Sequence, residues 1–75
     1  MDRATLEKDL AQAERHIAQG QKQIAVQRRI IAALEQEAHH HDTVKARELL
    51  ASFERTQAMH VANRDRFAGK LAALD

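Results

Sequence analysis

The sequence over residues 6–38 reads LEKDLAQAERHIAQGQKQIAVQRRIIAALEQEA, and its apolar or small residues recur in alternating steps of four and three. This spacing keeps them on one line of an α-helix, as in the heptad repeat of a coiled coil, whose positions are lettered a to g. With Leu10 at position a and Leu6 at position d, the line comprises Leu6, Leu10, Ala13, Ile17, Gly20, Ile24, Gln27, Ile31, Leu34 and Ala38. The spacing predicts one long helix over about residues 4–38.

A turn signal follows this helix. Three histidines, which are weak helix formers, precede Asp42 and Thr43, two residue types that favour helix N-caps. We expect a turn over about residues 39–42 and a second helix over about 43–74, capped by Asp42 or Thr43. The second helix has its own heptad line, with Leu50 at position a and Phe53 at position d.

Because the connection is short, the two helices should lie side by side and antiparallel. The predicted fold is all-α: a single-domain antiparallel two-helix hairpin. A turn centred near Asp42 pairs residues whose numbers sum to about 84, so that Gly20 faces Arg64 and Ile24 faces His60. The expected core consists of Leu6, Leu10, Ile17, Ile24, Ile31, Leu34, Leu50, Phe53, Phe67, Leu71 and Leu74.

Charge pairs across the two helices support this register. It places Glu35 beside Arg47 and Arg28 beside Glu54, which are opposite charges in both cases. Exposed pairs of this kind contribute only about 0.3–0.5 kcal/mol each, so they select a register more than they stabilise it. A register shifted by half a heptad and a single continuous helix of about 70 residues, at 1.5 Å per residue, are the alternatives.

The composition favours helix and argues against a lone hairpin. Alanine supplies 15 of 75 residues, proline is absent, and Leu, Ile, Val and Phe together number only 16. This is close to the composition at which chains fail to fold alone. Cysteine is also absent, so no disulfide can compensate and a reducing compartment such as the cytoplasm is favoured. We expect a homodimer in which two hairpins form a four-helix bundle.

A second periodicity suggests where the hairpins meet. Alanine recurs every seven residues at position b of the first helix, and small residues also occupy positions b and e of the second. Small side chains permit close helix approach, although alanine is also the best helix former for a plain surface. The expected dimer interface comprises Ala11, Ala18, Ala25, Ala32, Ala51, Ala58, Val61 and Ala68.

Polar residues interrupt the heptad lines near their centre. This polar seam comprises Gln27, Gln57, His60 and Arg64. Buried polar side chains at such positions fix register and oligomeric state at some cost in stability. Gly20 costs about 1 kcal/mol in a helix interior, which implies close contact with a bulky side chain. We expect that side chain to be Arg64, whose stem could otherwise pack while its charge reaches solvent.

Two further groups could carry chemistry. His39, His40, His41 and Asp42 are potential metal ligands, but consecutive side chains diverge, so we expect a solvated turn and no cofactor. Cationic residues recur along the outer surface of the rod and could contact phosphate: Lys8, Arg15, Lys22, Arg29, Arg55 and Arg66. Intervening glutamates and a net charge of +1 make nucleic acid the less favoured partner.

The strings HDTVKARELLASFERTQAMHVANRDR (residues 41–66) and AERHIAQGQKQIAVQRRIIAALE (residues 13–35) resemble short helical proteins of soil alphaproteobacteria. That group has no assigned activity, so the resemblance implies a small bacterial helical protein and no mechanism. The three consecutive histidines depart from the shorter His-Asp-Thr turn of the group.

The sequence contains no glycine-rich phosphate loop or nucleophile elbow, and no uninterrupted apolar run of membrane-spanning length. We expect a cytoplasmic, non-enzymatic structural or adaptor module that binds a protein partner and no membrane. A small nucleic-acid-associated protein is the alternative.

Overall fold

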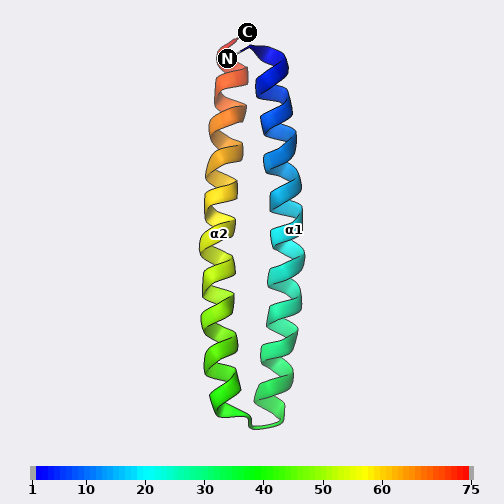
Figure 1. Ribbon diagram of the computed structural model, residues 1–75, viewed down its shortest axis with the longest axis vertical. Helices are drawn as coiled ribbons and strands as arrows, with labels where there is room; N and C mark the ends of the chain where they lie inside the picture. Colours follow the sequence, from blue (N-terminus) through cyan, green and yellow to red (C-terminus); the bar gives the residue numbers. More distant parts are fainter. Residues whose placement is uncertain (1, 75) are drawn as a thin grey trace.

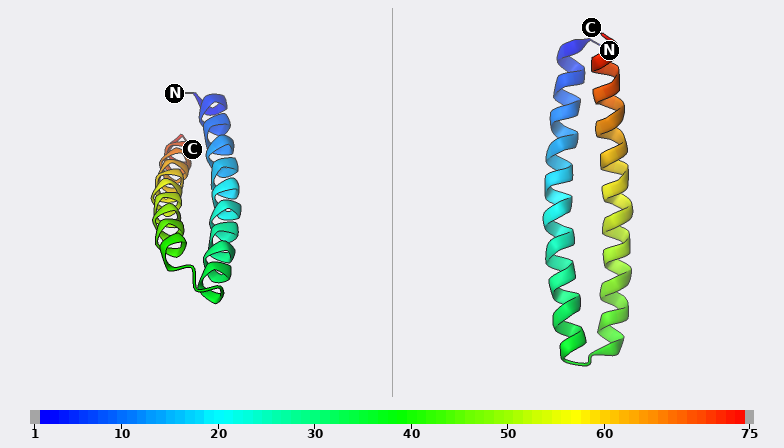
Figure 2. Two further views of the ribbon diagram at one scale, coloured as in Figure 1. Left: turned by 60° about the horizontal axis from the view of Figure 1, so that its bottom comes forward. Right: turned by 180° about the vertical axis from the view of Figure 1, so that it is seen from behind.

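Two antiparallel helices of equal length form the molecule. The computed structural model describes residues 2–74. Helix α1 spans Arg3–Gln36 and helix α2 spans His40–Ala73, and they lie side by side with both chain ends at one end of the rod (Figure 1). The view from behind shows the same arrangement (Figure 2). Within the described residues the chain is all-helical, measures 55 × 14 × 13 Å, and confirms the expected hairpin.

Helix α1 begins with a side-chain cap. Asp2 has an extended backbone, and its Oδ1 accepts a hydrogen bond of 2.8 Å from the backbone N–H of Thr5. Such a bond satisfies one of the N–H groups that have no partner in the first helical turn. The same bond favours the ionised carboxyl and holds the pKa of Asp2 below its ordinary value.

The chain reverses at Glu37–His39, earlier than the expected turn at residues 39–42. Ala38 adopts a left-handed backbone with φ of 61°. The N–H of His39 donates to the carbonyl of Leu34 at 3.1 Å, and that of Ala38 donates to Glu35 at 3.3 Å. This pair of bonds is the Schellman motif, in which glycine usually takes the left-handed position. Because alanine holds that position here, the sequence carries no glycine to mark the end of α1.

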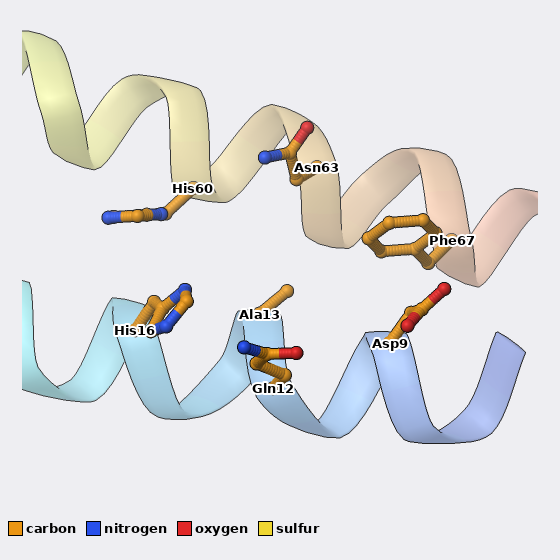
Figure 3. A pocket seen from close by; sticks show the side chains of 7 residues that line it. All are labelled: Asp9, Gln12, Ala13, His16, His60, Asn63 and Phe67. Atoms are coloured by element: carbon orange, nitrogen blue, oxygen red, sulfur yellow. The ribbon is translucent and has the colours of Figure 1, made fainter. Parts of the chain in front are cut away.

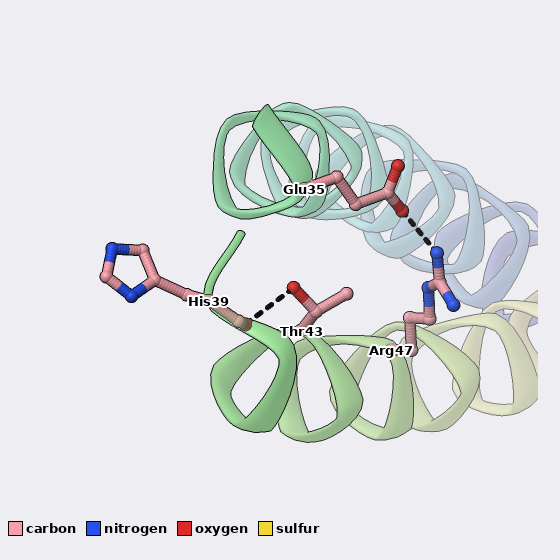
Figure 4. Close-up of polar contacts among 4 residues, drawn as sticks. All are labelled: Glu35, His39, Thr43 and Arg47. Carbon is pink, nitrogen blue, oxygen red and sulfur yellow. Dashed lines mark hydrogen bonds and ion pairs between the residues drawn. The ribbon is translucent and has the colours of Figure 1, made fainter. Parts of the chain in front are cut away.

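Helix α2 also starts earlier than expected, and its N-cap is His39. The expected caps, Asp42 and Thr43, lie inside the first turns of the helix. The Thr43 backbone N–H donates to the carbonyl of His39 at 2.9 Å. The Thr43 hydroxyl donates to the same carbonyl, also at 2.9 Å (Figure 4). This local hydrogen bond occupies the Thr43 hydroxyl, so Thr43 does not act as the N-cap of α2. Asp42 in the first turn places a negative charge near the positive end of the helix dipole.

The core is a thin line between the helices. Its buried members are Leu6, Ala13, Ile17, Gln27 and Ile31 of α1 and Thr43 and Ala46 of α2. The other expected core residues are half-buried, except that Leu74 at the open end is 47% exposed. Two helices cover one another from one side only, so large side chains that flank the line keep contact with solvent.

The helices pair in a different register from the expected one. Gly20 lies against Gln57 instead of Arg64, which is a shift of a whole heptad. The two expected ion pairs nevertheless form, with Arg28 and Glu54 at 3.7 Å and Arg47 bonded to Glu35 (Figure 4). These long, largely exposed side chains reach across about one helical turn, so they are compatible with both registers.

Candidate functional site

Two glutamines fix the relative position of the helices. The Gln27 Nε2 donates to the carbonyl of Ala46 at 2.9 Å, and the Gln57 Nε2 donates to the carbonyl of Ile17 at 2.9 Å. Each bond runs from a side chain of one helix to the backbone of the other. Because buried donors without acceptors cost about 1–3 kcal/mol, sliding one helix would break both bonds at a high cost.

Gly20 provides the space for one of these glutamines. A Cβ atom at position 20 would lie 1.8 Å from the Gln57 Oε1, so any larger residue would displace this amide. The expected neighbour, Arg64, is instead half-exposed, and its guanidinium bonds to Asp65 at 3.0 Å. The Gln57 Oε1 is buried and has no hydrogen-bond partner among the described residues. The amide is therefore held by shape and by one bond.

His60 lies beside the seam instead of inside it. Its ring is 4.9 Å from the ring of His16, measured between centroids, with the planes tilted by 47°. Both rings line a cleft of about 250 Å³, in which Asp9 and Asn63 flank Phe67 (Figure 3). His16 is not among the residues expected from the sequence to form a site, although its position g places it next to the seam.

The cleft is the first part of a longer groove along one side of the rod. A second hollow adjoins it at the two histidines and continues past Gln19, Gln23 and Thr56. A third hollow follows and is lined by Lys22, Gln23, Val26 and Phe53. We call this side the groove face. It is formed by positions g and c of α1 (Asp9, Gln12, His16, Gln19, Gln23, Val26, Ile30) and positions d and g of α2 (Leu49, Phe53, Thr56, His60, Asn63, Phe67).

The predicted alanine interface lies on the opposite side of the rod. We call this side the alanine face; Ala51 and Val61 are half-buried there, and the other members are exposed: Ala11, Ala18, Ala25, Ala32, Ala58 and Ala68. The ion pairs Arg28–Glu54 and Glu35–Arg47 occupy positions e on this side. A hollow near the turn is lined by Thr43 and Val44 together with the second ion pair. The role of the alanine face in dimerisation stays a prediction.

The histidine string does not gather ligands. His39, His40, His41 and Asp42 are all exposed. His40 and His41 begin α2, where successive side chains are about 100° apart, while the His39 Nε2 is 3.3 Å from the Glu37 carboxylate. Across residues 2–74 no three His, Cys, Asp or Glu side chains are grouped as metal ligands would be.

The cationic side chains are exposed but lie in different directions. Lys8, Arg15, Lys22 and Arg29 occupy position f, the outermost line of α1. Arg55 is at position f of α2, which points away from α1 on the other edge of the rod. Arg66 bonds to Asn63 at 3.2 Å and lies over the Phe67 ring. The six residues therefore do not form one continuous basic surface.

Neither helix, over the residues described, has an apolar segment long enough to cross a bilayer. No family model, curated protein or solved structure matches this chain. The resemblance to short bacterial helical proteins stays a prediction, and the surface of the hairpin is the remaining guide to its function.

Proposed function

We propose that the protein is a non-enzymatic, cytoplasmic structural or adaptor module that binds other proteins through the long sides of its hairpin. The observation that carries this proposal is the exposure of six large apolar side chains, between 44% and 66%, on regular helices: Val26, Ile30, Val44, Leu49, Met59 and Leu74. Apolar side chains on ordered helices are suited to packing against a partner helix.

The first partner we propose is a second copy of the chain. Among residues 2–74, the buried hydrophobic core of one hairpin consists of Leu6, Ala13, Ile17, Ile31 and Ala46. Ordering 75 residues costs on the order of 100 kcal/mol in conformational entropy, and so thin a core offsets little of this cost. Pairing two hairpins into a four-helix bundle would cover apolar surface that each leaves open.

Analytical ultracentrifugation across a concentration series tests this assignment. A homodimer should show twice the 8.5 kDa chain mass, and its melting temperature should rise with concentration because association stabilises the folded state. A folded monomer with a concentration-independent melting temperature, up to millimolar protein, would contradict the homodimer.

The alternative is nucleic-acid binding along α1, favoured by the exposed line of Lys8, Arg15, Lys22 and Arg29. Fluorescence anisotropy with random duplex and single-stranded oligonucleotides at about 50 mM salt separates the two functions, because counterion release favours binding under those conditions. Micromolar affinity that weakens steeply with salt would support the alternative. Absence of binding would leave the adaptor function.

A further inference from the structure

The exposed apolar side chains are concentrated on one side of the rod. Val26 and Ile30 occupy positions c and g of α1, while Leu49 and Met59 occupy positions g and c of α2. All four therefore belong to the groove face or its rim. Of the remaining two, Val44 lies on the alanine face and Leu74 lies at the open end of the rod. The groove face is therefore the more apolar of the two sides.

The centre of the groove face carries little formal charge, and Lys22, which lines the third hollow from position f, is the cation at its edge. From Gln12 to Ile30 on α1, and from Leu49 to Asn63 on α2, its positions hold no Asp, Glu, Lys or Arg. The alanine face, in contrast, is bordered by the two ion pairs at positions e. Charged residues are depleted and aromatic residues enriched at the centres of protein interfaces, and this combination describes the groove face.

The exposed area of one hairpin is large enough to supply a dimer interface. One hairpin exposes 5487 Å². A folded monomer of this mass typically exposes about 4,700 Å², which leaves an excess of about 800 Å² per chain. A standard protein interface buries about 800 Å² on each partner. This excess, which accompanies the elongated shape of the rod, is large enough to supply a standard interface with one further copy.

We propose that the groove face of the hairpin packs against the groove face of a second copy, giving a four-helix bundle with both turns at the same end. This inference rests on the proposed homodimer and assigns its contact surface to the groove face instead of the alanine face.

The distribution of apolar residues along the rod determines the orientation. Val26 and Ile30 lie in the half near the turn, whereas Asp9 and the polar cleft lie in the half near the termini. A twofold axis along the rod places Val26 and Ile30 of one copy against Leu49 and Phe53 of the other. With the turns at opposite ends, Ile30 would instead meet the Asp9 region, and the more apolar half of each groove face would lie against the more polar half of the other.

Two charge variants test the surface. Ile30 and Leu49 are 44% and 46% exposed, so the double variant Ile30→Glu, Leu49→Glu leaves the core of each hairpin intact. It should weaken dimerisation by roughly 100-fold or more, because unpaired carboxylates would be buried in the contact. The matched control is the triple variant Ala18→Glu, Ala25→Glu, Ala58→Glu on the alanine face, which should dimerise like the unmodified chain. Sedimentation gives the masses, and circular dichroism reports whether each variant remains helical.

The outcomes separate the two proposals. If the groove-face variant still dimerises while the alanine-face variant dissociates, the interface assignment is overturned and the homodimer stands. If the unmodified chain is monomeric at millimolar concentration, the homodimer itself fails. If the groove-face variant loses its helices, Val26→Lys offers a single change at a half-exposed position, and an unchanged dimer affinity in that variant overturns the assignment.

The orientation has its own measurement. The chain has no cysteine, so Glu37→Cys in the turn accepts one spin label per copy. With both turns at one end, the two labels should lie about 15–30 Å apart, given interhelical distances of 8–10 Å. A separation near the rod length of 55 Å would overturn the common-end arrangement.

Discussion

The two helices have the same length and the same heptad spacing, but they are buried very differently. Helix α1 buries five residues spread from its first turn, at Leu6, to its last turns, at Ile31. Helix α2 buries only Thr43 and Ala46, both within its first two turns. Beyond Ala46, α2 contributes half-buried side chains, the hydrogen bond from Gln57 to the backbone of α1, and the exposed ion pairs of Arg47 and Glu54 with α1.

Side-chain shape explains the difference. The line of α1 consists of compact residues such as Ala13 and Ile17, which fit between two closely spaced backbones. The line of α2 carries Phe53, His60 and Phe67, which are too large or too polar for that space and lie along the groove instead. Heptad spacing therefore indicates which line of a helix faces its partner, whereas residue size determines how deeply each position is buried.

The largest expected effect compares one core position from each helix. Ile17→Ala should lower the free energy of unfolding by about 3 kcal/mol, because Ile17 is only 8% exposed and the cavity cannot refill. Leu71→Ala in the half-buried part of α2 should cost about 1 kcal/mol, since solvent already reaches that side chain. Urea unfolding followed by circular dichroism at one protein concentration measures both. Equal losses would show that the asymmetry in burial has no energetic counterpart.

The next effect comes from the contact between Gly20 and Gln57. The sign of the stability change on replacing Gly20 depends on whether Gln57 is present. In the unmodified chain, Gly20→Ala should destabilise by about 1 kcal/mol, because the loss of the Gln57 bond outweighs the gain in helix propensity. In a Gln57→Ala background the same change should stabilise by about 1 kcal/mol. A double-mutant cycle from urea unfolding tests the coupling. Identical effects in both backgrounds would mean that Gly20 is not kept free for Gln57.

The turn offers a smaller, stabilising change. Ala38→Gly should raise the free energy of unfolding by about 0.5–1 kcal/mol, since glycine adopts the left-handed backbone of this position without a steric penalty. Ala32→Gly, in an exposed turn of α1, is the control and should destabilise by about 1 kcal/mol. Thermal unfolding of the two variants should therefore shift in opposite directions.

The smallest effect is the pH dependence of the α1 cap. The hydrogen bond from Thr5 holds the pKa of Asp2 below its ordinary value of 3.8. The stabilisation of the fold by the ionised Asp2 cap is therefore present above that pH. It is lost as the pH falls through the lowered pKa of the folded chain. Asp2→Asn keeps a capping oxygen but does not titrate, so its stability should fall less steeply between pH 5 and pH 2 than that of the unmodified chain. Parallel acid titrations would refute the assignment.

Much of the architecture follows from local sequence. The spacing of Leu6 to Leu34 predicts a long helix with one buried line, and the weak helix formers near residue 39 predict a reversal. The glutamines of the polar seam are also recognisable from their positions, because polar residues on an apolar heptad line fix the register of the helices. Their acceptors, the carbonyls of Ala46 and Ile17, belong to the other helix and carry no mark in the local sequence.

The register, the position of the turn and the groove face depend on contacts between the helices. A heptad pattern superimposes on itself after a shift of seven residues, so the sequence spacing is equally satisfied by Gly20 against Arg64 or against Gln57. The fit of one amide into the space left by a missing Cβ breaks that degeneracy. The proximity of His16 to His60 and the groove that they line become recognisable only in this register. The residues that line the groove come from distant parts of the chain, and the packing of the helices brings them together.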